Sequence, residues 1–166
     1  MEIPVTKISD NLFKAIGDDW MLITAGTKDR FNTMTASWGA CGILWSMPVA
    51  ICFIRPQRYT YQFMEKSNYY TLSFFREEYR EILQFCGSYS GKEVDKIAST
   101  GLKPLLTKTG SVYFEQARLM LECKKLYADR INPGRFIIPE IKDTVYPGRD
   151  YHKFYIGEII SCLLND

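Results

Sequence analysis

Short apolar runs alternate with polar turns along most of the chain. Runs of a few residues that are rich in Val, Ile, Phe and Tyr are typical of β-strands. They predict strands over residues 20–25, 33–38, 48–55 and 69–75, a strand from Val112, and a last strand over residues 152–164. Turn residues separate the first two runs, which predicts a hairpin. Residues 48–55 are almost continuously apolar and lie between prolines, which indicates a strand buried on both faces.

A few segments favour short helices. Ser9 or Asp10 can cap a short helix, and the polar segment after Pro56 fits a helix better than a strand. A helix ending at Gly87 is predicted by apolar residues at helical spacing, namely Tyr79, Ile82, Leu83 and Cys86. A small helix is expected at residues 94–98, and a Pro- and Gly-marked excursion at residues 131–148.

The order of these elements predicts an all-β barrel with short peripheral helices. Neither the helices nor their spacing support repeated βαβ units, which a parallel sheet would need. Closure of the sheet into a barrel would remove exposed strand edges. The chain has 166 residues, 46% of them hydrophobic, so we expect residues 1–166 to form a single domain around one core.

The charge balance argues against nucleic acid as a binding partner. The 21 basic and 19 acidic residues leave a net charge of +2, which is too small for a sequence-independent grip on nucleic acid. A small anion such as phosphate remains possible, because it requires only a few local donors and charges. The longest apolar stretch, residues 42–54, is too short to span a bilayer, and residues 1–19 do not resemble a signal. We therefore expect no membrane association and a cytoplasmic location.

The cysteines and the single histidine exclude several kinds of site. Five cysteines form an odd set without CxxC spacing, namely Cys41, Cys52, Cys86, Cys123 and Cys162. This argues against a disulfide framework and a zinc site, and favours buried thiols. With His152 as the one histidine, and without GxSxG, HExxH, GxGxxG or GxxxxGK[ST], the sequence signals no hydrolase, Rossmann or P-loop site. No metal site is expected.

Two groups of polar residues carry the remaining chemistry. Hydroxyl and amide side chains, with the backbone of a strand end, can bind the edge of a planar heteroaromatic ring. Candidates for this role are Asn32, Thr33, Thr35 and Ser37, with Trp38 and Trp45 as possible walls. The alternative is that they form only the solvated face of a strand.

The second group is suited to an anion. Arg55, Arg58 and Thr60 match the geometry of a phosphate, and a helix beginning near Tyr59 would add its positive end. The segment SYSGK, residues 88–92, is a second loop with hydroxyls and a cation. Solvated surface charge is the alternative interpretation of both segments.

Four longer segments follow one another in the order NTMTASWGACGILWSMPVAICFIRPQRYTYQF, YYTLSFF, FCGSYSGKEVDK and DYHKFYIGEI. Together they resemble the flavin reductase-like family, and in particular its flavoredoxin-type branch. The resemblance runs from about Leu22 to Ile159. It implies the FMN-binding split β-barrel, a Greek-key fold with short peripheral helices.

The resemblance also implies roles for individual residues. The ring of FMN would lie along the first segment, so the ring-binding candidates are Asn32, Thr33, Met34, Thr35, Ser37 and Trp38. The ribityl phosphate would be held by Arg55, Arg58 and Thr60, with further contacts from Ser90 and Lys92. His152, the catalytic candidate, would lie on the nicotinamide side of the ring, where it donates a hydrogen bond or only orders its loop.

The function implied is that of an FMN-binding oxidoreductase that accepts hydride from NAD(P)H. Electrons would pass to a flavin or to another small-molecule or protein acceptor, and no protein nucleophile is required. An FMN electron carrier of the flavoredoxin kind, reduced by a partner protein, is one alternative. A non-enzymatic split barrel that binds flavin, haem or another ligand is a second. The family likeness further implies a homodimer with the flavin at or near the interface.

Overall fold

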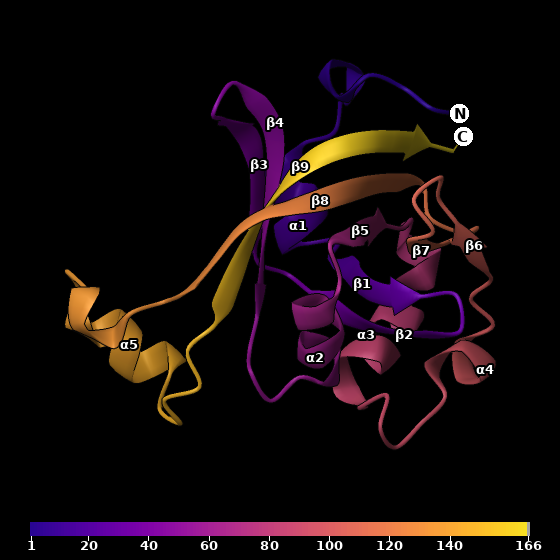
Figure 1. Cartoon of the computed structure of the whole chain (residues 1–166). Coiled ribbons are helices and arrows are strands. Elements are labelled where there is room, and N and C mark those ends of the chain that lie inside the picture. The colour runs from indigo at the N-terminus through magenta and orange to yellow at the C-terminus, as the bar shows by residue number, and fades with distance from the viewer. Residues whose placement is uncertain (166) are drawn as a thin grey trace.

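A seven-stranded antiparallel sheet lies at the centre of the protein, as the computed structural model of residues 1–165 shows (Figure 1). The strands follow the order β2-β1-β5-β8-β9-β4-β3. Their bounds are β1 Met21–Thr27, β2 Arg30–Ala36, β3 Gly39–Leu44, β4 Met47–Ile54, β5 Tyr69–Phe74, β8 Leu119–Arg130 and β9 Lys153–Leu164. Neighbours in the sheet such as β1 and β5 are far apart in sequence, as in a Greek key. The predicted all-β barrel with peripheral helices is confirmed.

The two ends of the sheet, β2 and β3, are joined by only two residues, Ser37 and Trp38. Within residues 1–165 these strands are not paired with each other, so the barrel is open on one side and the expected closure is partial. A Cβ on Gly39 would lie 2.9 Å from the carbonyl oxygen of Ile51, so only glycine fits at this point. Because β2 pairs only with β1 within residues 1–165, its other edge remains free for other contacts.

The apolar stretch after Trp38 forms a hairpin, of which the sequence pattern predicts only the second strand. Trp45 and Ser46 connect β3 to β4 with φ angles of 51° and 59°, as a two-residue hairpin turn requires. The expectation that residues 48–55 are buried on both faces is wrong. Side chains such as Ile51 and Phe53 are only half-buried, because this face of β4 borders the open side of the barrel.

The strand predicted from Val112 is interrupted by a turn. It divides into β7, Val112–Phe114, and the long β8. β7 pairs with β6, Pro104–Leu106, in a small second sheet, while β8 pairs with β5 and β9. The Thr71 hydroxyl in β5 donates to the carbonyl oxygen of Val112 over 2.6 Å, which joins the two sheets.

Within the described residues, five short α-helices surround the sheet. They are α1 Leu12–Gly17, α2 Tyr59–Lys66, α3 Arg80–Ser88, α4 Lys96–Thr100 and α5 Pro139–Val145, with 3-10 turns at Val5–Lys7, Glu77–Tyr79 and Pro133–Arg135. α2 and α3 pack on β1 and β2. α5 lies in the β8–β9 loop, residues 131–152, which extends away from the barrel (Figure 1). No helix in residues 1–165 has the length and apolar composition that crossing a bilayer requires.

Helix boundaries differ from the predictions in a few places. The side chain of Asn11 caps α1, so the predicted caps Ser9 and Asp10 are wrong. The helix expected at residues 94–98 is α4, which begins later because Asp95 caps it. The sequence pattern does not predict α5, because the prolines around it are typical loop signals. α3 continues one residue beyond the predicted end, Gly87.

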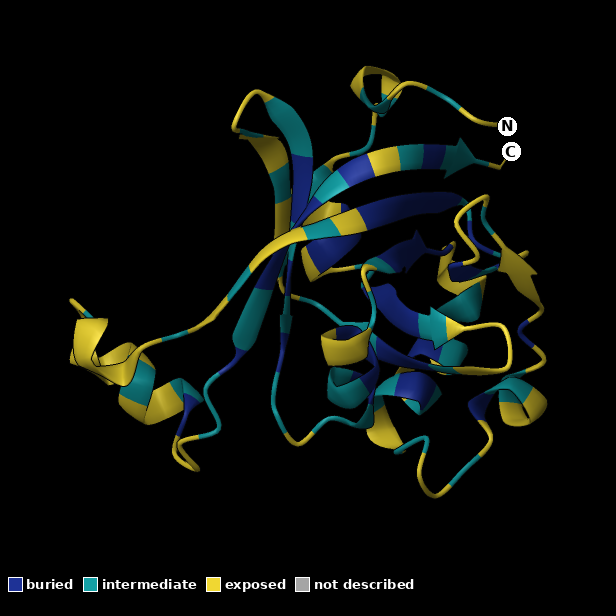
Figure 2. Cartoon of the chain, viewed as in Figure 1, coloured by how far each residue is buried: buried dark blue, intermediate teal, exposed yellow. Residues whose placement is uncertain are grey.

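The buried residues follow the sheet, whereas the β8–β9 loop is mostly exposed (Figure 2). One core cluster contains Tyr70, Phe74 and Tyr155 from the strands of the barrel. A second cluster packs α3 against β1 and β7. Four of the five cysteines are buried and Cys41 is half-buried, with all five thiols free, as predicted.

Candidate functional site

Two cavities meet beside the free edge of β2. The first, the β2 cavity, has a volume of about 240 Å³ and is lined by residues 34–38, Phe53, Arg55, Arg58 and His152. The second, the α2 cavity, has a volume of about 140 Å³ and lies between the start of α2 and the end of α3. Its lining consists of Asn32, Met34, residues 57–60, residues 87–91 and Lys96. Met34 and Arg58 line both cavities, so the two form one elongated site.

The α2 cavity collects hydrogen-bond donors and positive charge. Arg58 is the N-cap residue of α2, a position that leaves the first backbone N–H groups of the helix without a side-chain cap. Its guanidinium donates to the carbonyl oxygen of Gly87 over 3.1 Å, and burial lowers its pKa. Thr60 is buried and its hydroxyl accepts from Asn32 Nδ2 over 2.9 Å. Ser90 lines the same cavity.

Beside the half-buried Arg58, Lys96 adds a buried cation, which no sequence pattern indicates. Its Nζ donates to the carbonyl oxygens of Thr33 and Cys86, each over 2.7 Å. Burial, assisted by the positive charge of Arg58, lowers the pKa of Lys96 to about 8. Among residues 1–165 neither Lys96 nor Arg58 forms an ion pair with a carboxylate. A buried and a half-buried cation beside one cavity without a counter-ion favour an anionic ligand there.

Several of the predicted ring-binding hydroxyls are used within the protein. Thr33 Oγ1 lies 2.9 Å from Thr24 Oγ1 and 3.3 Å from the carbonyl oxygen of Ile23. The Thr35 hydroxyl donates to the carbonyl oxygen of Leu83 in α3. The Ser37 hydroxyl makes no hydrogen bond within residues 1–165. A ligand in the β2 cavity therefore meets Ser37 and the backbone of an end strand rather than a row of free hydroxyls.

Arg55 lies in the β2 cavity and not in the α2 cavity. Its guanidinium pairs with Asp150 over 2.6 Å and donates to the carbonyl oxygen of Val145 over 3.2 Å. It also stacks over the ring of Tyr146, 5.1 Å from the ring centroid. Arg55 therefore shares the β2 cavity with Arg58 but does not reach the α2 cavity, and it ties the β8–β9 loop to the end of β4.

His152 closes the outer end of the β2 cavity. It is buried, and its ring lies 5.1 Å from that of Trp38 and 6.3 Å from that of Phe53. Its Nδ1 is 2.8 Å from the hydroxyl oxygen of Tyr146. Burial and the charge of Arg55 lower the pKa of His152 to about 4, against the smaller opposite effect of Asp150. His152 is therefore uncharged at neutral pH.

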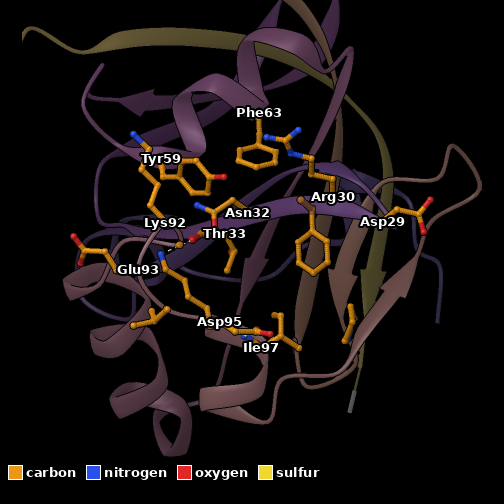
Figure 3. Close-up of a pocket in the computed structure, with 15 residues that line it drawn as sticks. Asp29, Arg30, Asn32, Thr33, Tyr59, Phe63, Lys92, Glu93, Asp95 and Ile97 are labelled. Carbon is orange, nitrogen blue, oxygen red and sulfur yellow. Dashed lines mark hydrogen bonds between the residues drawn. The ribbon is translucent and has the colours of Figure 1, made fainter.

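Thr33 and Lys92 line a third hollow, the outer cavity, whose volume is about 570 Å³. It adjoins the α2 cavity, with which it shares Asn32, Tyr59, Gly91 and Lys96. Figure 3 shows it between Arg30 and Phe63 on one side and Asp95 and Ile97 on the other. Lys92 Nζ lies 5.6 Å from the centroid of the Tyr59 ring and lines the outer cavity only. Among the predicted phosphate contacts, Arg58, Thr60 and Ser90 come together in the α2 cavity, whereas Arg55 and Lys92 do not.

The two tryptophans considered as walls also differ. Trp38 borders the β2 cavity and an apolar groove of about 500 Å³ along α1, which Phe13, Ile16 and Cys41 also line. Trp45 lies at the tip of the β3–β4 hairpin and lines neither hollow. The expectation that Trp45 walls the pocket is therefore not supported by its position.

The complete site has two unlike ends. The α2 cavity offers charge, hydroxyls and a helix N-terminus, and the β2 cavity offers a free strand edge between aromatic rings and an uncharged imidazole. Such a site suits an elongated ligand with an anionic group at one end and a planar ring at the other. Within residues 1–165 no group of three or more His, Cys, Asp or Glu side chains is arranged to hold a metal ion.

Comparison with known proteins identifies the family of this chain. A family model described as the flavin reductase like domain matches residues 14–166. The FMN-binding protein from Thermus thermophilus, in a structure with bound p-hydroxybenzaldehyde, has 21% identity and a TM-score of 0.70, over 89% of this chain and 71% of that one. No curated protein gave a significant match.

Two further solved structures share the fold. Flavoredoxin of Desulfovibrio vulgaris has 23% identity and a TM-score of 0.68, over 89% of this chain and 69% of that one. The NADH:FAD oxidoreductase of Streptomyces globisporus, in complex with NAD and FAD fragments, has 16% identity and a TM-score of 0.66, over 93% of this chain and 81% of that one. At these identities the structures establish the split-barrel fold. Because the family model covers nearly the whole sequence, the chain belongs to the flavin reductase-like family.

Proposed function

We propose that the protein is an FMN-binding oxidoreductase that accepts hydride from NAD(P)H and passes electrons to a flavin or to another acceptor. The observation that carries this proposal is the joined pair of cavities on β2. One end holds a buried and a half-buried cation, Lys96 and Arg58, without a carboxylate partner, and the other is lined by a strand edge and aromatic rings. FMN has a phosphate and a planar ring in this order, so the residues present fit it.

The phosphate end is assigned to Arg58, Thr60, Ser90 and Lys96, with the first backbone N–H groups of α2. A phosphate there would neutralise both cations and gain charge-assisted hydrogen bonds. The ring end is assigned to residues 34–38 of β2 and the following turn. Bound FMN supplies the hydride and electron chemistry. The chain would orient the ring in the β2 cavity, which Trp38 and the uncharged His152 line.

Titration of the purified protein with FMN and with riboflavin, followed by anaerobic addition of NADH and then NADPH, tests this function. We expect FMN to bind more tightly than riboflavin, and its 450 nm absorption to bleach on addition of one of the nicotinamides. Equal affinities would contradict the phosphate assignment. Failure to take up either flavin would contradict the function as a whole.

An FMN electron carrier is the second candidate. Trp38 is 46% exposed and borders the apolar groove, in which Phe13 is 93% exposed, so a partner protein could approach the ring end directly. The solved flavoredoxins share the fold. Bound FMN that resists both nicotinamides but is reduced by a low-potential electron donor would favour the carrier over the reductase.

We also infer a homodimer. Large apolar side chains are exposed at the tip of the β3–β4 hairpin and in the β8–β9 loop, namely Ile43, Trp45, Ile137, Ile138 and Ile141. Ile43 is 75% exposed and Ile137 is 96% exposed, which is costly for a monomer in water. Light scattering after gel filtration should give twice the chain mass of 19.3 kDa. A monomer at micromolar concentration would contradict this inference.

A further inference from the structure

Tyr146 and His152 form a buried pair at the outer end of the β2 cavity. The Tyr146 hydroxyl oxygen lies 2.8 Å from His152 Nδ1, and the two rings meet edge to face with centroids 5.5 Å apart. Both residues are buried. Tyr146 directly follows α5, so this hydrogen bond joins the β8–β9 loop to the wall of the cavity.

The groups around the pair determine the charge state of each ring. Arg55 and Arg58 face the cavity with positive charges, and Asp150 is paired with Arg55 on the outer side. Burial and Arg55 lower the pKa of His152 to about 4, while burial raises the pKa of Tyr146. A neutral imidazole beside a protonated phenol allows two arrangements, because the hydroxyl can donate to Nδ1 or accept from Nδ1–H. In the first arrangement, the hydroxyl donates and Nδ1 accepts.

An accepting Nδ1 places the remaining imidazole proton on Nε2. Within residues 1–165, Nε2 has no hydrogen-bond partner, yet it is not sealed in the protein. The only fully enclosed side-chain oxygen or nitrogen atoms without a partner there are those of Tyr70 and Ser73. His152 lines the β2 cavity, and Trp38 and Phe53 flank its ring. The Nε2–H group is therefore free to meet a ligand in that cavity.

We propose that Tyr146 is a positioning residue that holds His152 as a neutral hydrogen-bond donor, with its Nε2–H directed into the β2 cavity. The ligand group it serves is a carbonyl oxygen, either on a planar ring or on the carboxamide of a second ligand stacked beside it. A neutral donor that keeps its proton favours binding and orientation over proton transfer. The use of the Nε2–H group during turnover rests on the proposed function. The arrangement of Tyr146 and His152 does not depend on it.

The sequence contains one histidine, so every imidazole signal of the tag-free protein reports on His152. Long-range proton–nitrogen NMR spectra of the nitrogen-15-labelled protein should show a single neutral tautomer, protonated at Nε2, from pH 8 down to about pH 5. In Tyr146→Phe, which removes the donor to Nδ1, we expect a mixture of the two tautomers and a higher imidazole pKa. Tyr151→Phe is the matched control, because its ring stacks on Tyr146 at 4.9 Å without a hydrogen bond to His152.

Either of two results would overturn the proposal. The wild-type spectrum could show a proton on Nδ1 or a charged imidazole at neutral pH, which needs no variant and is decisive even if Tyr146→Phe does not fold. Alternatively, a folded Tyr146→Phe could keep the wild-type tautomer. These spectra require no flavin and no turnover, so a failed flavin titration would leave them interpretable. If the protein is a reductase, Tyr146→Phe should also raise KM for the nicotinamide more than it lowers kcat.

Discussion

The ammonium group of Lys96 lies 2.7 Å from the carbonyl oxygen of Thr33 and fixes the edge of an end strand to the start of α4. The same group lines the α2 cavity, where no carboxylate among residues 1–165 neutralises it. The Asp95 carboxylate next to it is used as the cap of α4. One side chain therefore organises the strand that would carry the ring and supplies charge where a phosphate would bind.

Replacing Lys96 with Met should weaken FMN binding more than riboflavin binding, because only FMN carries the phosphate. A hydrogen bond to a charged group contributes roughly 1.5–3 kcal/mol, which corresponds to about 10- to 100-fold in affinity. Quenching of flavin fluorescence measures both affinities. The control is Lys92→Met. Because Lys92 lines only the outer cavity, its loss should change neither the FMN affinity nor the riboflavin affinity. A larger effect at Lys92 than at Lys96 would reverse the assignment of the phosphate contact.

The affinity for FMN should fall as the pH rises above about 8. The pKa of Lys96 in the flavin-free protein is about 8, and a bound dianion would raise it, so binding takes up a proton above this pH. The phosphate of FMN is already doubly charged there and does not titrate. Riboflavin titrations over the same pH range are the control, and the riboflavin affinity should not change with pH. An FMN affinity that is constant from pH 7 to pH 9.5 would show that Lys96 does not face the phosphate.

The sequence predicts those parts of the site that depend on local pattern. The strand preceding Arg55 and the helix beginning at Tyr59 follow from apolar runs and Pro56, so the position of Arg58 at a helix start is predictable. The position of Lys96 beside the cavity is not predictable, because its partners Thr33 and Cys86 come from distant segments. The sequence KEVDK that contains it is typical of the surface of a short helix. The resemblance groups Arg55 with Arg58, yet the chain turns from strand to helix between them, and only Arg58 also reaches the α2 cavity.

Contacts between distant segments cannot be predicted from local pattern either. The alternation of Thr33, Thr35 and Ser37 predicts polar side chains on one face, but not that Thr24 and Leu83 occupy the first two hydroxyls. Tyr146 lies in a segment marked by prolines and glycine, where no pattern indicates burial. Its contact with His152 depends on how the whole β8–β9 loop folds back onto the barrel.

Arg55 and Arg58 should respond differently to the same conservative change. In Arg58→Lys the loss of guanidinium contacts at the α2 cavity should lower the ratio of FMN to riboflavin affinity several-fold. In Arg55→Lys this ratio should stay at the wild-type value. The loop should instead open more often, because the ion pair with Asp150 and the bond to the Val145 carbonyl are weakened. Limited trypsin digestion, followed as the rate of cleavage after Arg149, measures the opening.

Equal losses of the affinity ratio in both variants would contradict this separation of roles. So would an Arg55→Lys protein whose loop is cleaved at the wild-type rate. Digestion of Arg58→Lys provides the reference for an arginine-to-lysine exchange that leaves the contacts of Arg55 with the β8–β9 loop in place.

The stability of the protein should depend on His152 in mildly acidic solution. The pKa of His152 falls from 6.5 to about 4 on folding, so the unfolded chain binds the proton first as the pH decreases. The contribution is fully present above pH 6.5 and is lost as the pH falls from 6.5 to about 4. A tenfold difference in proton affinity corresponds to about 1.4 kcal/mol, and partial solvent screening reduces the total, so we expect a loss on the order of 2 kcal/mol. Urea unfolding at pH 7 and at pH 4.5 measures it.

The control is His152→Asn, whose amide oxygen can accept from Tyr146 in place of Nδ1 but does not titrate. Carboxylates also titrate in this range, and Glu65, whose pKa is lowered in the folded state, adds to the loss in both proteins. The difference between the two pH profiles therefore isolates the histidine. If wild type and His152→Asn lost the same free energy of unfolding between pH 7 and pH 4.5, the imidazole would be accessible and charged well above pH 4. His152 would then be an ordinary surface histidine, and its burial against Trp38 would not persist in solution.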